Sequence, residues 1–107
     1  MNEPAMDLSE IMDLYKEDAR QAIAQMQGAM ERWKEVVQGG PARTDLRRLS
    51  HQLRGSGRTY GFREVTRIGK AIENTVQKME RDALRPDNRV RQALSVKIDR
   101  LQALFRS

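Results

Sequence analysis

Residues 49–62 read LSHQLRGSGRTYGF and contain His51, the one histidine of this 107-residue chain. In and just before this stretch, apolar side chains recur at the three- and four-residue intervals of one helix face, at Leu46, Leu49, Leu53 and Tyr60. At about 100° per residue, the side chain of His51 points away from that face. The sequence therefore predicts a helix that buries one side and presents an exposed imidazole on the other.

Cationic side chains surround this imidazole. The residues that fall within about 60° of His51 around the helix axis are Arg47, Arg48, Arg54, Gly55 and Arg58. A guanidinium group can bind an anion through parallel hydrogen bonds. Gly55 and Gly57 each cost about 1 kcal/mol of helix stability relative to alanine. Two readings of them stay open: Gly55 gives another molecule space beside the imidazole and Gly57 lets a helix approach, or both only ease helix packing.

Amphipathic patterns run through the rest of the chain. The first follows an N-cap pattern at Asp7 and Glu10 and predicts one long helix or two in line, with apolar positions Leu8, Met12, Tyr15, Ala19, Ile23, Met26, Met30, Trp33 and Val37. A later pattern comprises Val65, Ile68, Ile72, Val76, Met79 and Ala83. The last comprises Val90, Leu94, Ile98, Leu101 and Phe105.

Helix-breaking residues separate these patterns. The sequence Gly39-Gly40-Pro41 ends the first helix, and the next begins near residues 41–44. Gly61 ends that second helix, Pro86 ends the third, and Asp87 can cap the fourth. Four amphipathic helices joined by short connections predict an all-α antiparallel four-helix bundle. We expect residues 1–6 to be a flexible tail and residues 7–107 to be the domain.

Composition limits the possible functions. The chain has no cysteine and one histidine, which argues against a disulfide framework and against a zinc site. It has no apolar run of the roughly 20 residues that a membrane span needs and no secretory signal, so we expect a cytoplasmic protein. The formal net charge is +5, and it is concentrated between Arg43 and Lys70, where basic residues far outnumber acidic ones. Such a field favours an anionic partner.

The segment HQLRGSG at residues 51–57 resembles the H-x-[LI]-[KR]-G-[SG]-[AG] signature of histidine phosphotransfer (HPt) domains. The segments RTYGF at residues 58–62 and IEN at residues 72–74 are similar to further parts of that family. The likeness extends from about residue 7 to residue 105. It is greatest to the N-terminal phosphotransfer domains of CheA-type chemotaxis kinases.

The resemblance implies a role for each matching residue. His51 would accept a phosphoryl group, most simply through Nε2. Arg54, where the family usually has lysine, would screen the phosphoryl charge, and Gly55 would give a receiver domain access. Glu73 would accept a hydrogen bond from Nδ1 of His51 and so orient the ring. Lys70 stands where chemotaxis kinases often have a second histidine.

The implied function is that of a phosphoryl carrier in a two-component phosphorelay. The domain would take a phosphoryl group from a histidine kinase, in cis or in trans, or from a receiver, and pass it to a receiver-domain aspartate. The segment Gly55-Ser56-Gly57 lacks the spacing and lysine of a nucleotide-binding P-loop, so we expect no ATP-dependent kinase activity of this domain alone. Whether it is the phosphoacceptor domain of a larger kinase stays open. We expect no bound cofactor or metal, ATP and Mg²⁺ being supplied by partner domains, and a monomeric domain with no membrane or nucleic-acid partner.

Two other functions stay open from the residues alone. One is a basic helical module that binds nucleic acid or another polyanion through Arg43, Arg47, Arg48, Arg54, Arg58, Arg63 and Arg67. Such binding would weaken steeply with salt and would not depend on His51. The other is an inert bundle that serves as an adaptor or a dimerisation domain. In the phosphotransfer interpretation, Arg47, Arg48 and Arg58 are candidates for steering a partner by charge.

Overall fold

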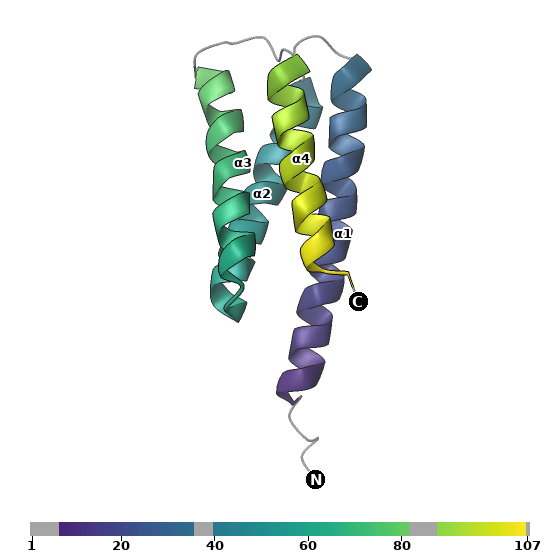
Figure 1. The fold of residues 1–107 in the computed structure, drawn as a ribbon, viewed down its shortest axis with the longest axis vertical. Helices are drawn as coiled ribbons and strands as arrows, with labels where there is room; N and C mark the ends of the chain where they lie inside the picture. The colour runs from purple at the N-terminus through teal and green to yellow at the C-terminus, as the bar shows by residue number, and fades with distance from the viewer. Residues whose placement is uncertain (1–6, 36–39, 82–87, 107) are drawn as a thin grey trace.

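A computed structural model describes residues 7–35, 40–81 and 88–106 of the chain. Four helices make up its secondary structure, namely α1 (Leu8–Glu35), α2 (Gly40–Tyr60), α3 (Arg63–Arg81) and α4 (Asn88–Leu104). Successive helices run in opposite directions, as Figure 1 shows. Each helix packs against the next, and α4 packs back against α1. The predicted all-α four-helix bundle is confirmed.

The helix ends are set by local signals. The carboxylate of Asp7 caps α1, since its Oδ1 accepts a hydrogen bond of 2.8 Å from the backbone N–H of Glu10. Gly61 has a φ of 80° and ends α2. The backbone N–H of Phe62 then bonds to the carbonyl of Gly57 at 2.8 Å, an arrangement typical of helix ends at a left-handed glycine. The first helix is continuous, which settles the alternative of one long helix or two. The predictions for residues 1–6, Val37, Gly39, Ala83, Pro86 and Asp87 lie outside the described residues.

The apolar stripes meet in one core. Its largest fully buried side chains include Trp33, Met26, Leu46, Leu53, Ile72, Leu94, Ile98 and Leu101. Two predicted core positions are wrong, because Leu8 is 74% exposed and Tyr60 is 38% exposed. The reason for Leu8 is that the first turns of α1 project beyond the other three helices (Figure 1). No helix of the described residues is long and apolar enough to cross a membrane.

An aromatic cluster lies at the end of the bundle from which α1 projects. The ring of Tyr15 stacks on Tyr60 with 4.6 Å between the centroids, and it also contacts Phe62 and Phe105. Burial raises the pKa of Tyr15 above its usual value. Because its ring stacks on Tyr15, Tyr60 covers the edge of the core with one face while its other side remains exposed.

Two glycines bring α2 and α3 close together, and this pair forms the most extensive interface of the bundle. A Cβ atom added to Gly57 would lie 2.8 Å from Oγ1 and 3.0 Å from the backbone nitrogen of Thr66. A Cβ atom added to Gly69 would lie 3.1 Å from the carbonyl oxygen of Ser50 and from the nitrogen of Arg54. The close approach suggested by Gly57 is therefore present. Gly69 has the same role on α3, which was not predicted from the sequence.

Candidate functional site

His51 lies on the exposed ridge of α2. Its side chain is 74% exposed, whereas Leu49 and Leu53, on the opposite face of the same helix, are buried in the core. The helical periodicity that buries these leucines thus turns the imidazole outward, as the sequence predicts. A group in this position is accessible to another molecule.

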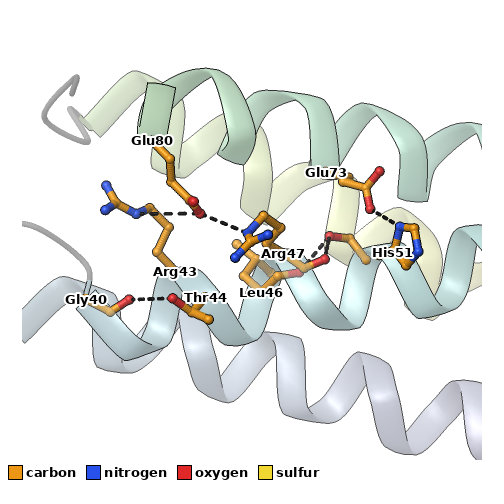
Figure 2. A network of polar contacts seen from close by, with 9 residues as sticks. Gly40, Arg43, Thr44, Leu46, Arg47, His51, Glu73 and Glu80 are labelled. Carbon is orange, nitrogen blue, oxygen red and sulfur yellow. Dashed lines mark hydrogen bonds and ion pairs between the residues drawn. The ribbon is translucent and has the colours of Figure 1, made fainter. Parts of the chain in front are cut away.

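A buried carboxylate on α3 contacts this exposed ring. Nδ1 of His51 lies 2.5 Å from Oε2 of Glu73, whose side chain is only 4% exposed (Figure 2). An ionised carboxylate can only accept hydrogen bonds, so we assign the ring proton to Nδ1. The other ring nitrogen, Nε2, then carries an unshared electron pair. The arrangement fixes both the orientation and the tautomer of a nucleophilic imidazole.

Arg54 binds the other oxygen of the same carboxylate. Its NH1 group donates a hydrogen bond of 2.8 Å to Oε1 of Glu73. A buried carboxylate is stable only when it is paired and hydrogen-bonded, and Arg54 supplies the opposite charge. The side chain of Arg54 is 40% exposed, and its guanidinium group has further N–H donors besides the one that binds Glu73. The structure therefore brings His51, Arg54 and Glu73 together in one cluster, with Glu73 joining the other two.

Gly55 lies one helical turn from His51 and meets nothing in the bundle. A Cβ atom added there would have no heavy atom of another element within 4 Å. This is the opposite of Gly57, two residues later, where a Cβ atom would collide with α3. Packing within the bundle therefore explains Gly57 and does not explain Gly55.

The arginines around His51 fall into two groups. Arg43 and Arg47 both reach Glu80 on α3, with the guanidinium Nε atoms 4.0 and 3.2 Å from Oε1 (Figure 2). Arg48 lies 3.9 Å from a carboxylate oxygen of Asp45, on its own helix. By contrast, Arg58 has no ion-pair partner among the residues that the structure describes. Of the three arginines expected to steer a partner, Arg47 and Arg48 therefore each contact a carboxylate and Arg58 contacts none among the described residues.

A groove of about 610 Å³ between α2 and α3 begins at His51. It is lined by His51, Arg54, Gly55, Gly57, Arg58, Gly61, Arg63, Thr66, Arg67 and Lys70. This grouping was not predicted from the sequence, although a signal for it exists. Arg63, Arg67 and Lys70 are spaced by four and three residues, the interval that places side chains on one face of a helix.

A second groove of about 550 Å³ lies between α1 and α2, on the other side of the α2 ridge. Its lining from α2 includes Gln52, Ser56 and Tyr60, and its lining from α1 includes Ile11, Leu14 and Tyr15. Leu14, which lines this groove, is 52% exposed. His51 thus stands between a cationic groove and a more apolar one. In the described part of the chain, no three His, Cys, Asp or Glu side chains are grouped so that they could hold a metal ion.

Comparison with known proteins gives one match. The family model of the Hpt domain matches residues 10–106, which is nearly the whole chain. Neither the search of curated proteins nor the search of solved structures gives a match.

Proposed function

Because the chain belongs to the Hpt domain family, which acts in phosphotransfer of two-component signalling, we propose that His51 is the residue that carries the phosphoryl group. The donor is a kinase or a phosphorylated receiver, and the acceptor is the aspartate of a receiver domain. The observation that carries this proposal is the exposed imidazole whose Nδ1 is held by buried Glu73. The residues match the chemotaxis-kinase type of the family in Thr59, Tyr60, Gly61 and Glu73, so we assign the chain to that type.

The chemistry of each transfer follows from this geometry. The electron pair of Nε2 forms a bond to phosphorus, the bond between phosphorus and the donor oxygen breaks, and that oxygen leaves with the bonding electrons. The ring becomes positively charged while its proton stays on Nδ1, facing the Glu73 carboxylate. In the second transfer, the receiver carboxylate attacks phosphorus and Nε2 recovers its electron pair.

Arg54 and the partners supply the remaining groups. The N–H donors of Arg54 that do not bind Glu73 are available to the phosphoryl oxygens, so one guanidinium group can hold the orienting carboxylate and screen the added charge. ATP and Mg²⁺ come with the partner domains. Because its partners use ATP, we infer that the chain acts in the cytoplasm. We also infer that the isolated domain acts as a monomer.

We assign receiver docking to the groove between α1 and α2. The groove borders the ridge that carries His51, and it exposes Leu14 beside Gln52 and Ser56. Apolar surface of this kind next to a reacting group favours a protein partner, because burying it on binding is favourable.

Replacing Leu14 with alanine tests this docking surface. We expect the dissociation constant for a receiver that accepts the phosphoryl group to rise about tenfold, with little change in protein stability, because Leu14 is already half exposed. Leu8→Ala is the matched control, since Leu8 is an exposed leucine of the same helix that does not line the groove. Isothermal titration calorimetry measures both. An equal loss for both variants would refute the assignment.

Gly55 and Gly57 provide a second matched pair. Gly55→Ala is expected to raise the free energy of unfolding by up to about 1 kcal/mol, because alanine favours the helix and meets open space. The same substitution is expected to slow transfer to the receiver about tenfold, because the new methyl group stands beside the reacting imidazole. Gly57→Ala is expected to lower the free energy of unfolding by about 1–2 kcal/mol through collision with Thr66.

Urea unfolding and rapid-quench phosphotransfer separate these two effects. A Gly55→Ala variant that transfers at the wild-type rate would remove Gly55 from the partner contact.

The function as a whole is tested by incubating the purified chain with panels of phosphorylated receiver domains and of kinases with ATP and Mg²⁺. We expect a small number of partners to exchange phosphate with the chain within seconds. Phosphate exchange with none of a broad panel, together with salt-sensitive nucleic-acid binding that His51 does not affect, would favour the polyanion-binding alternative instead.

A further inference from the structure

The cationic side chains near His51 differ in whether they form ion pairs. Arg43 and Arg47 share the carboxylate of Glu80, and Arg48 shares that of Asp45 with Arg32. On the groove that begins at His51, however, three cationic side chains have no ion-pair partner among the described residues, namely Arg58, Arg63 and Lys70. Other cations without an ion-pair partner in the described part of the chain, such as Lys78, Arg89 and Lys97, lie outside this groove, so these three are distinguished by lining one cavity together.

The groove has no carboxylate among its lining residues. Its other two cations are partly compensated from outside the groove, Arg54 by Glu73 and Arg67 by Glu64. Arg67 donates hydrogen bonds of 3.0 and 2.7 Å to the two oxygens of Glu64, which lowers the pKa of Glu64 and raises that of Arg67. This pair is fully exposed, so it holds Arg67 only weakly. Cations gathered in this way repel one another, and a bound anion would relieve that repulsion.

Size and shape indicate what kind of anion would fit. The volume of about 610 Å³ lies within the range of small-molecule sites, roughly 300–1,000 Å³. From His51 to Arg58, the groove follows about 10 Å of α2 at 1.5 Å per residue. Gly55 and Gly61 contribute no side chain, and a Cβ atom at either would meet open space. Guanidinium groups recognise phosphate through parallel hydrogen bonds.

A long nucleic acid fits these observations less well. It would need a basic stripe that continues along α2, and the arginines at that end of the helix are the ones paired with Glu80 and Asp45. Arg58, Arg63 and Lys70 line only the short groove. The observations therefore favour a short phosphate chain over an extended polyanion.

We propose that the groove lined by Arg58, Arg63 and Lys70 binds a short phosphate chain beside His51, as in the triphosphate of a nucleotide held by the kinase. The catalytic role of this groove rests on the proposed function of His51. When Nε2 bonds to the terminal phosphorus, the bond to the bridging oxygen breaks and the departing diphosphate keeps the electron pair. The cations of the groove stabilise the negative charge that grows on that leaving group.

The test uses the whole chain, sodium tripolyphosphate as the probe, and calorimetry at low salt. The combined variant Arg58→Gln, Arg63→Gln and Lys70→Gln is expected to weaken binding at least about tenfold, since several charge-assisted hydrogen bonds are lost. The control variant Lys78→Gln, Arg89→Gln and Lys97→Gln removes the same charge from positions outside the groove, and we expect it to change binding less than about threefold. Equal weakening by the two variants, or no binding by the wild-type chain, would overturn the proposal.

Two further arms identify the source of the phosphate chain. ATP is expected to bind at least as tightly as tripolyphosphate. If the chain binds tripolyphosphate but does not bind ATP, a role for a nucleotide is overturned. A single-stranded oligonucleotide that binds through the same three residues more tightly than tripolyphosphate would overturn the proposal in favour of nucleic acid. Tripolyphosphate binding is measured without phosphotransfer, so the groove and the phosphoacceptor can fail independently.

Discussion

Substitution of His51 by glutamine is expected to abolish phosphate uptake from every donor that phosphorylates the wild-type chain. Glutamine occupies a similar position and can hydrogen-bond to Glu73, but its amide has no electron pair that attacks phosphorus at a useful rate. The imidazole is 74% exposed, so its loss removes little buried surface and the free energy of unfolding should change by less than about 1 kcal/mol.

Labelling with radioactive phosphate over seconds, beside a thermal melt, measures both quantities. A folded His51→Gln protein that still takes up phosphate normally would show that another residue is the acceptor.

Replacing Glu73 with glutamine is expected to slow phosphorylation of His51 about a hundredfold. The carboxylate only accepts hydrogen bonds and so keeps the proton on Nδ1, with Nε2 free. The amide of glutamine can instead donate to Nδ1, which favours the tautomer with the proton on Nε2 and removes the nucleophile. The loss of the negative charge also removes the group that stabilises the positively charged ring during attack.

The Glu80→Gln variant is a matched control for this prediction. Glu80 is also a carboxylate of α3 that pairs with arginines of α2, yet it contacts Arg43 and Arg47 and not His51. Its substitution should leave the phosphorylation rate within about threefold of wild type, since loss of such partly exposed ion pairs has a small effect. Nitrogen NMR of the imidazole should report the change of tautomer in Glu73→Gln alone. If both variants slow phosphorylation equally, Glu73 does not act through the ring.

The fold was predictable because its signals are local. The cap at Asp7, the stop at Gly61 and the apolar periodicity of each helix depend on neighbouring residues only. The two core predictions that were wrong, Leu8 and Tyr60, lie where the bundle ends. Periodicity shows which face of a helix is apolar, but it does not show how far the partner helices extend.

The residues of the site could be predicted from the sequence, but the contacts between them could not. His51 and Gly55 stand out by position alone, while the role of Glu73 came from the family resemblance, because nothing in the spacing states which helix faces the imidazole. Gly69 is visible in the sequence as a glycine within a helix, one turn before Glu73. The reason for it, the close approach of α2, becomes clear only in the structure. The size of the interhelical gap depends on such small residues.

Which arginines form ion pairs and which do not could not be predicted from the sequence. Glu80 pairs with Arg43 and Arg47 across 37 and 33 positions of sequence, and such pairing depends on the register between two packed helices. Only the tertiary structure shows that Arg58, Arg63 and Lys70, which have no ion-pair partner among the described residues, share the groove that begins at His51.

The central claim is that Nε2 of His51 carries the phosphoryl group. It is tested most directly by phosphorylating the chain with ¹⁵N-labelled histidine and locating the nitrogen–phosphorus bond by NMR coupling between ¹⁵N and ³¹P. We predict coupling to Nε2 of His51, with Nδ1 still protonated and facing Glu73. Coupling to Nδ1, or a phosphoryl group on an oxygen of another residue, would contradict the account.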